Sequence, residues 1–303
     1  EYKPAVIVGI GGGSAMDSAK SIAVLAENPL PISQHFTTNG GGMFFGKDVK
    51  LILIPTNSGT GSEVTPISVV HDMKRNVKDT ILRAADLAIL DPELTLTAPA
   101  KVTAASGMDA MSHAVEAYTS NNTNPKSDLL ALEAIRLIND NLEKACVNGK
   151  DIDARSALSF ASNIAGISFA DASVHIGHCA AHELGVQLEA PHGVICAIAA
   201  PCVVEFAASA TPIEKMKKMA EALSLKVPEG ADSVEIGKLC AAAMRELARK
   251  VNVPSLKELG ATREQCIACA EGAVKNNWFY IMAPKEVNVE VMADFIANMY
   301  DNY

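Results

Sequence analysis

The pattern of hydrophobic and polar positions changes near residue 99. Before it, apolar runs of four residues alternate with polar or glycine-rich turns, a pattern typical of buried parallel strands. A helical pattern from Met16 to Ala26 follows the first run. Strands are expected at 5–8, 51–54, 68–71 and 87–90. Strand, helix and strand in this order predict an α/β layer structure.

After Pro99 the sequence is rich in Ala, Leu, Met and Glu with helical spacing, almost to its end. A chain of 303 residues is long for one hydrophobic core, so two domains are expected. We predict a partial α/β, Rossmann-like dinucleotide-binding domain over 1–98 and an all-helical metal and substrate domain over 99–303. The boundary is expected between Asp91 and Pro99.

Composition narrows the class of protein. Hydrophobic residues make up 49% and charged residues 20%, as in a globular protein, and the net charge of −9 argues against a nucleic-acid partner. No apolar run reaches the ~20 residues that span a bilayer, and no signal peptide opens the chain. Seven scattered cysteines favour reduced thiols and therefore the cytoplasm. The absence of an initiator Met favours a fragment or a processed chain.

A glycine-rich turn, Gly11-Gly12-Gly13-Ser14, lies between the first strand and the first helix. Glycines allow close approach to a phosphate, and the free N–H groups at the start of a helix attract negative charge. Ser14 is also a candidate N-cap. The run departs from the usual dinucleotide fingerprint, because it ends in Ser14 and no acidic residue closes a strand about 20 positions later. A tight structural turn is therefore an equally good interpretation.

A second polar turn, from Thr56 to Ser62, follows the second strand. In open α/β sheets, ligands gather at the carboxyl ends of strands. Two hydroxyl-rich turns on one edge favour a single extended ligand with phosphates and ribose, such as a dinucleotide. A solvated turn is the alternative.

Four of the seven histidines fall between His175 and His192, and Asp109 precedes His113 by four residues. A spacing of four places two side chains on one face of a helix, and His178 and His182 share it. Imidazole and carboxylate ligands suit Fe²⁺, Zn²⁺ or Mn²⁺. These residue types predict a metal site, while their spacing leaves open which histidines of this stretch bind.

Four motifs now stand in order: GGGS, PT-x-x-GTGSEVT, GMDA-x-x-HA-x-EAY and H-x3-H-x-LG followed by PHG. This combination resembles the iron-containing (group III) alcohol dehydrogenase family over nearly the whole chain. The resemblance implies an oxidoreductase that transfers a hydride between NAD or NADP and a small primary alcohol or aldehyde. The metal would act as a Lewis acid on the substrate oxygen. A homodimer is implied as well.

The resemblance also implies roles for individual residues. The metal, Fe²⁺ with Zn²⁺ as the alternative, would be held by Asp109, His113, His178 and His192. His182 would lie between metal and nicotinamide as the catalytic residue, and His175 would be a bystander. The residues implied to bind the cofactor come from the two turns and a later lysine: Gly11, Gly12, Gly13, Ser14, Asp17, Thr56, Asn57, Thr60, Ser62 and Lys78.

The chain departs from the family pattern at several points. Ala15 stands where proline is usual, Asn57 replaces the second threonine of a PTT turn, and Glu183 replaces a frequent proline. Relatives carry roughly 80 further residues before the first strand, including the acidic residue that discriminates NAD from NADP. The cofactor preference therefore stays open.

Two other interpretations are kept. One is a zinc-dependent polyol (glycerol-type) dehydrogenase or a dehydroquinate-synthase-like enzyme on the same scaffold. The other is a non-catalytic binding protein derived from the enzyme.

Overall fold

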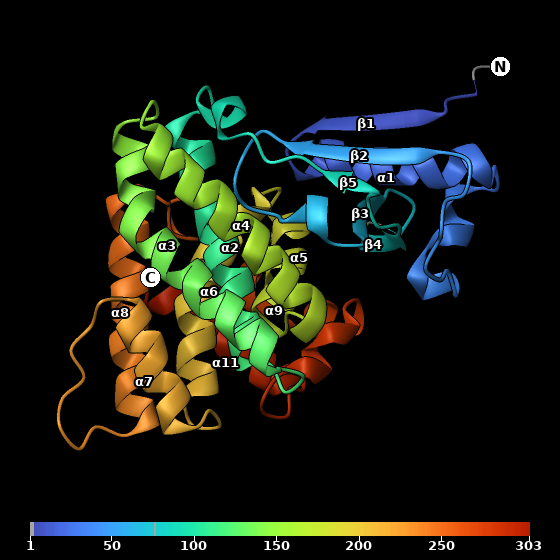
Figure 1. Cartoon of the computed structure of the whole chain (residues 1–303). Helices are drawn as coiled ribbons and strands as arrows, with labels where there is room; N and C mark the ends of the chain where they lie inside the picture. Colours follow the sequence, from blue (N-terminus) through green and yellow to red (C-terminus); the bar gives the residue numbers. More distant parts are fainter. Residues whose placement is uncertain (1–2, 76) are drawn as a thin grey trace.

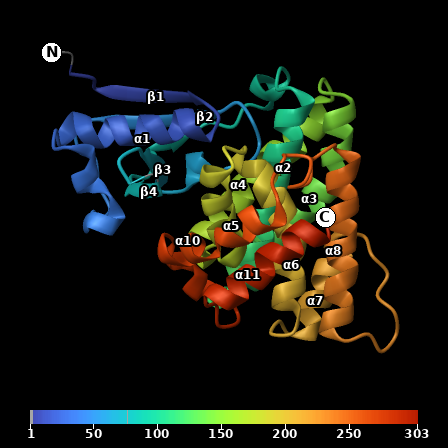
Figure 2. The same cartoon turned by 180° about the vertical axis from the view of Figure 1, so that it is seen from behind.

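The computed structural model describes residues 3–75 and 77–303. Within them, a small α/β region formed by the first third of the chain sits beside a larger helical region (Figure 1). The view from behind shows the same division, with the strands on one side of the molecule and the long helices on the other (Figure 2). The predicted α/β plus all-helical fold is confirmed.

The N-terminal region contains a three-stranded parallel sheet in the order β1-β2-β5. Its register pairs Gly11 with Pro55, so the two predicted ligand turns leave the sheet side by side. The strands and the helix that links the first two are β1 (Val6–Gly11), α1 (Gly13–Glu27), β2 (Lys50–Pro55) and β5 (Leu87–Ala88).

A separate antiparallel hairpin is made of β3 (Ile67–Asp72) and β4 (Val77–Leu82). All four predicted strands are found, but β4 was not predicted, because Lys78 and Asp79 interrupt its apolar pattern. In the fold, Asp79 is buried and is compensated by hydrogen bonds from Arg75 and Thr38. Thr38 lies 41 residues away in the sequence, so its part of this compensation leaves no signal within the strand.

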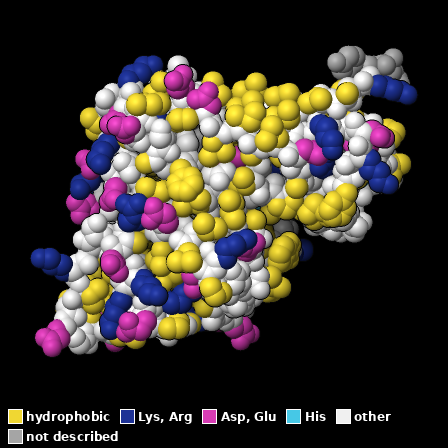
Figure 3. Space-filling view, viewed as in Figure 1, with side chains coloured by type: hydrophobic (Ala, Val, Ile, Leu, Met, Phe, Trp, Pro, Cys, Tyr) yellow, Lys and Arg dark blue, Asp and Glu magenta, His cyan; other side chains and the backbone are white. Residues whose placement is uncertain are grey.

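Helix α1 covers one face of the parallel sheet, where Met16, Ala19 and Ala23 pack on Leu51 and Leu53. The other face of β1 is apolar and open. Hydrophobic side chains gather along the upper edge of the molecule in the space-filling view (Figure 3), and the exposed β1 residues are Val6 (48%), Val8 (50%) and Ile10 (57%). Parallel sheets are ordinarily covered on both faces. In the described part of the chain, only the face of this sheet that packs against α1 is covered.

From residue 100 onward the described chain is helical, as predicted. The α-helices are α2 (Ala100–Thr119), α3 (Pro125–Val147), α4 (Ile152–Ala172), α5 (Ile176–Gln187), α6 (His192–Ala208), α7 (Ile213–Ala222), α8 (Ser233–Lys250), α9 (Arg263–Ala268), α10 (Ala270–Lys275) and α11 (Val289–Asp301). Short 3₁₀ helices are η1 (Ile32–His35), η2 (Thr37–Asn39), η3 (Ser62–Val64), η4 (Pro92–Thr95) and η5 (Trp278–Met282).

Helix α6 lies at the centre of the helical region. Every residue from Val194 to Val204 is buried, as expected for a helix that is apolar all round and enclosed by others. Among the described residues, no helix has the length and hydropathy needed to cross a membrane. The buried polar groups of the neighbouring helix α2, among them Asp109 and Glu116, are removed from water and need partners.

Candidate metal and cofactor site

Side chains from three helices converge on one buried point. Asp109 projects from α2, His178 from α5, and His192 and Cys196 from α6, and their ligand atoms all lie within 4.8 Å of one another. Nε2 of His178 is 3.9 Å and Nε2 of His192 is 3.7 Å from Oδ1 of Asp109. We call these four residues the metal cluster.

The metal cluster fits a divalent cation. Oδ1 of Asp109 is buried and has no hydrogen-bond partner within the described structure. Burial of an uncompensated carboxylate oxygen is costly, and the cost falls when a cation binds it. Carboxylate and imidazole donors are ligands of Fe²⁺ and Zn²⁺ in proteins. The residues present could therefore hold either ion.

His113 takes a different position from the other three predicted ligands. Its ring is stacked between Phe169 of α4 (centroids 4.4 Å apart) and His178 (4.6 Å), and its Nδ1 has no partner. Burial lowers the pKa of His113 to about 4, so the ring is neutral. The structure thus gathers Asp109, His178 and His192, and it leaves His113 alongside the cluster.

Cys196 was not predicted as a member of the cluster. Its Sγ lies 3.4 Å from Nε2 of His192 and 3.8 Å from Nε2 of His178. The sequence did contain a signal, because Cys196 follows His192 by four residues and α6 begins at His192.

Glu116 is a second functional candidate that sequence reasoning missed. It lies on α2 seven residues after Asp109, fully buried, and its carboxylate accepts a hydrogen bond from Nδ1 of His178. It also accepts backbone N–H bonds from His175 and Gly177. Burial alone would raise the pKa of Glu116, but the adjacent His178 outweighs it and holds the pKa at about 2. Glu116 therefore keeps the proton of His178 on Nδ1 and leaves Nε2 facing the cluster.

His182, the predicted catalytic residue, lies beside the cluster and outside it. Its ring centroid is 5.3 Å from that of His192. Nδ2 of Asn277 donates to the carbonyl of Ala273, so Oδ1 of Asn277 faces Nδ1 of His182 at 3.0 Å. The imidazole must then donate from Nδ1, which leaves Nε2 as a free acceptor. Burial, and next the nearby Lys78, hold the pKa of His182 well below its usual range.

His175, the predicted bystander, is the N-cap residue of α5. It is fully buried and its Nε2 is hydrogen-bonded with Thr119 at 3.0 Å. Burial lowers its pKa to about 4. Its Nδ1 lies 3.8 Å from Oε2 of Glu116.

The two predicted cofactor turns touch each other. A Cβ on Gly13 would lie 2.6 Å from Cγ2 of Thr60, and one on Gly12 would lie 3.1 Å from Nδ2 of Asn57. Only glycine permits so close an approach. The N–H of Thr56 also donates to the carbonyl of Gly11 at 3.0 Å.

Ser14 is exposed in the first turn of α1. The N-cap is Gly12, which has no side chain, so the prediction that Ser14 caps the helix is wrong. The helix starts two residues earlier than that interpretation requires, because the glycine run can enter it directly. Gly11, at φ 151°, has the conformation that favours glycine at the end of β1.

Asp17 and Ser62 are engaged inside the protein. Oδ1 of Asp17 accepts from Oγ of Ser62 at 2.6 Å, and its Oδ2 accepts from the N–H of Val69 at 3.0 Å. The ammonium of Lys20 donates to Ser62 at 2.7 Å and to the carbonyl of Ile67 at 2.6 Å. These groups join α1 to the second turn and to β3, and we call Asp17, Lys20 and Ser62 the buried polar network.

The second turn also connects the two regions. Oγ of Ser58 lies 3.1 Å from Oγ of Ser159, and Glu63 accepts from Asn163 at 3.0 Å, both partners belonging to α4. Lys78 reaches across from β4, with Nζ 3.5 Å from Nδ1 of His192. Burial lowers the pKa of Lys78. The implied ribose-binding lysine thus lies at the junction between the turns and the metal cluster.

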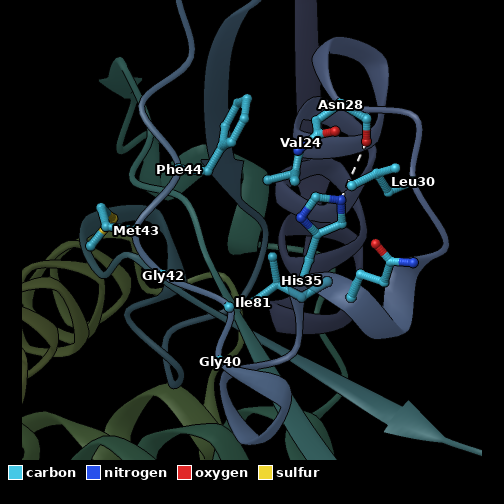
Figure 4. Close-up of a pocket in the computed structure, with 11 residues that line it drawn as sticks. Val24, Asn28, Leu30, His35, Gly40, Gly42, Met43, Phe44 and Ile81 are labelled. Atoms are coloured by element: carbon cyan, nitrogen blue, oxygen red, sulfur yellow. Dashed lines mark hydrogen bonds between the residues drawn. The ribbon is translucent and has the colours of Figure 1, made fainter.

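A hollow of about 320 Å³ lies elsewhere in the α/β region (Figure 4). The close-up shows the ring of His35 directed into it, hydrogen-bonded with the carbonyl of Asn28. None of the predicted site residues lines it. The lining residues are Val24, Asn28, Leu30, Gln34, His35, Gly40, Gly41, Gly42, Met43, Phe44 and Ile81.

Comparisons with known proteins identify the family. Residues 1–92 match the family model described as iron-containing alcohol dehydrogenase. Residues 103–300 match the model for the C-terminal part of the Fe-containing alcohol dehydrogenase family. The NAD-dependent methanol dehydrogenase of Bacillus methanolicus is 33% identical over 296 residues, 96% of this chain and 76% of that protein. A crystal structure of 1,3-propanediol oxidoreductase has a TM-score of 0.90 at 31% identity, covering 98% of this chain and 77% of that one.

The long-chain-alcohol dehydrogenase 1 of Geobacillus thermodenitrificans is 45% identical over 204 residues, 66% of this chain. The matched part spans about half, 51%, of that relative. The two family models together cover both regions of the fold. The predicted family is therefore confirmed, and this chain belongs to the iron-containing alcohol dehydrogenase family.

Proposed function

We propose that this chain is a metal-dependent, NAD(P)-linked oxidoreductase acting on a small primary alcohol or aldehyde. The observation that carries the proposal is the metal cluster, with its unpartnered Asp109 oxygen, beside a turn that follows β2 and touches the glycine-rich turn. Such chemistry requires a metal site and a cofactor site. A buried cation site near a turn suited to bind phosphate brings the two together.

The metal, when bound, supplies Lewis-acid polarisation of the substrate oxygen, and the nicotinamide cofactor supplies or accepts the hydride. We propose Asp109, His178 and His192 as ligands, with His113 or Cys196 completing the set. Glu116 orients His178 so that its Nε2 faces the cation. In many metal sites a carboxylate accepts a hydrogen bond from the ligand histidine and so fixes its orientation, and Glu116 would do this for His178.

His182 is proposed to handle the alcohol proton. Its Nε2 is an acceptor because Asn277 fixes the proton on Nδ1, and its lowered pKa keeps the ring neutral near pH 7. A neutral ring can orient the hydroxyl and accept its proton. Lys78, across the junction, adds positive charge that disfavours a lasting imidazolium.

Gly11, Gly12, Gly13 and Ser14 are proposed to bind the pyrophosphate, since backbone N–H groups at the start of α1 are available there. Thr56, Asn57 and Thr60 would line the remaining cofactor surface. Oδ1 of Asn57 is buried without a partner in the described structure, which supports a ligand contact. Asp17 and Ser62 would act through the buried polar network.

The proposal also covers the identity of the ion and of the cofactor, the cellular compartment and the oligomeric state. Fe²⁺ is the expected ion with Zn²⁺ as the alternative, and either NAD or NADP serves as cofactor. All seven cysteines are free thiols, which supports a reducing compartment such as the cytoplasm. A homodimer rests on the family resemblance, and the division into 1–98 and 99–303 rests on the change in sequence pattern near residue 99.

The test is a steady-state panel of small primary alcohols and aldehydes, run with NAD(H) and with NADP(H) on anaerobically purified protein. We expect turnover of at least one aldehyde and quenching or enhancement of NADH fluorescence on binding. Turnover of polyols alone would favour the glycerol-type alternative. No cofactor binding at millimolar NADH or NADPH would contradict the proposal and favour a non-catalytic binding protein.

A further inference from the structure

The short helix η5 lies beside His182 and carries apolar side chains from there to the surface. The ring of Phe279 meets the ring of His182 edge-on, with centroids 5.4 Å apart and planes at 87°. Trp278 meets Phe279 edge-on in turn, at 6.0 Å. Trp278 is 58% exposed and Ile281 is 56% exposed. Nothing in the function proposed above accounts for this apolar surface next to the residue that handles the proton.

A row of aromatic rings passes through the site and ends in phenylalanine in both directions. Successive ring centroids lie 4.4, 4.6, 6.3 and 5.4 Å apart, in the order Phe169, His113, His178, His182 and Phe279. His178 belongs to the metal cluster, and its two neighbours in the row adjoin the cluster. The groups next to these histidines are therefore apolar rings on either side.

The amide groups that precede η5 are already engaged. Oδ1 of Asn277 faces Nδ1 of His182 at 3.0 Å, and Nδ2 of Asn277 donates to the carbonyl of Ala273. Nδ2 of Asn276 donates to Glu183 at 3.0 Å. A hydroxyl group that lost its water beside Phe279 would find these amides committed to other partners, and an unpaired hydroxyl is costly to bury.

Hydrogen bonds from the end of α2 hold η5 in place. Nδ2 of Asn121 donates to the carbonyls of Ile281 and Ala283, at 2.8 Å and 3.2 Å. The N–H of Asn121 donates to the carbonyl of Met282 at 2.9 Å. A wall fixed by such contacts keeps its shape when a ligand binds, which is what discrimination between substrates of similar size requires.

We propose that Phe279 determines substrate specificity, and that this chain prefers primary alcohols and aldehydes with an apolar carbon chain over those with a second hydroxyl group. The inference rests on the proposed function. The carbon chain of the substrate lies along Phe279 toward Trp278, and its burial there removes apolar surface from water. A second hydroxyl group at the same place loses its water without gaining a partner.

The first test uses Trp278, the only tryptophan in the sequence, as a reporter of binding. Hexanamide, an unreactive carbonyl compound with an apolar chain, is titrated into the zinc-loaded wild-type protein, and acetamide is titrated in parallel. Hexanamide should shift the tryptophan emission to shorter wavelength, because the exposed indole becomes covered, and acetamide at the same concentration should not. Equal responses to the two amides, or no response to either, would overturn the inference.

The second test compares the oxidation of 1-butanol and 1,3-propanediol, which have equal numbers of non-hydrogen atoms and differ in a terminal methyl or hydroxyl group. In the wild type, kcat/KM should be at least about tenfold higher for 1-butanol. Phe279→Gln should reduce this preference by at least about fivefold. The change should appear mainly in KM, because the contact is remote from the reacting atoms.

Phe279→Leu is the matched control, since it also removes the ring but keeps an apolar side chain, and it should retain the preference for 1-butanol. The preference is a ratio within one protein, so partial loss of folded enzyme cancels. Turnover with no preference, with a preference for the diol, or with equal losses in both variants would overturn the inference and leave the proposed function standing. No turnover of either alcohol with metal and cofactor bound would contradict both.

Discussion

The metal cluster and the buried polar network place similar groups in opposite situations. In the cluster, Asp109 and its neighbours face one another without hydrogen bonds to Oδ1, so their bonding capacity is left for something else. In the network, Asp17, Lys20 and Ser62 satisfy one another and the backbone of β3. Here the unmet capacity of Asp109 is what points to a bound ion, whereas the mutually satisfied groups of the network join elements of the fold.

Removal of one donor of the metal cluster tests most strongly whether its unmet bonding capacity serves a metal ion. His178→Ala should reduce bound metal from one per chain to background and lower kcat/KM by at least about 10³-fold, because Lewis-acid stabilisation is worth several kcal/mol. NADH binding, which depends on the turns, should survive. Elemental analysis, turnover and NADH fluorescence titration measure the three quantities. His35→Ala, in the α/β region, is the control that should retain metal, and full turnover by metal-free His178→Ala would refute the assignment.

The network should respond to pH in a way that the cluster does not. Burial lowers the pKa of Lys20 from 10.5 to about 8. Between these pH values the unfolded chain keeps the lysine proton and the folded chain has lost it, so stability rises with pH through this window. The gain, wild type relative to Lys20→Met, is expected to be about 3 kcal/mol. Denaturant unfolding at pH 8 and at pH 10.5 measures it, and parallel profiles for the two proteins would contradict the burial of a charged lysine.

Glu116 tests whether a satisfied buried carboxylate can still serve the metal site. Glu116→Gln should weaken metal affinity by about 10–100-fold, because the ligand His178 loses the anion that fixes its tautomer and raises its basicity. Competition with a chelator measures the affinity. Glu63→Gln is the matched control, since Glu63 is also buried but accepts a hydrogen bond from Asn163 and lies in η3, directly after the second turn. Equal losses in both variants would mean that the effect is structural.

The contact between the two turns offers the smallest perturbation. Gly13→Ala would place a methyl group 2.6 Å from Cγ2 of Thr60 and force the turns apart. NADH binding is expected to weaken by about tenfold, a cost of about 1.4 kcal/mol, with metal content unchanged. Adding Thr60→Ser removes the Cγ2 atom and should restore part of the affinity. Unchanged NADH binding in Gly13→Ala would separate these turns from the cofactor.

Local patterns predicted much of this molecule. Apolar runs ending in turn residues located β1 and β2, and helical spacing identified the whole region after Pro99. Strand β4 escaped because Asp79 is compensated by Arg75 and Thr38, which no pattern within the strand records.

The site was predictable where it rests on spacing along one helix and less so where it rests on packing between helices. Spacing along one helix paired Asp109 with His113 and His178 with His182 as candidates, and only the family resemblance chose among them. The meeting of Cys196 with His178 depends on how α5 packs on α6. Glu116 lay within a recognised motif, but its role depends on the backbone of α5, which only the fold supplies.

The central claim is that one buried divalent cation and a nicotinamide cofactor act together at the junction of the two regions. The direct measurement is aldehyde reduction by NADH or NADPH in anaerobically purified protein, before chelation, after chelation, and after stepwise return of Fe²⁺ or Zn²⁺. Activity should fall with metal content and return in proportion to it, reaching a plateau at one ion per chain. Undiminished activity in protein shown by elemental analysis to be metal-free would contradict it.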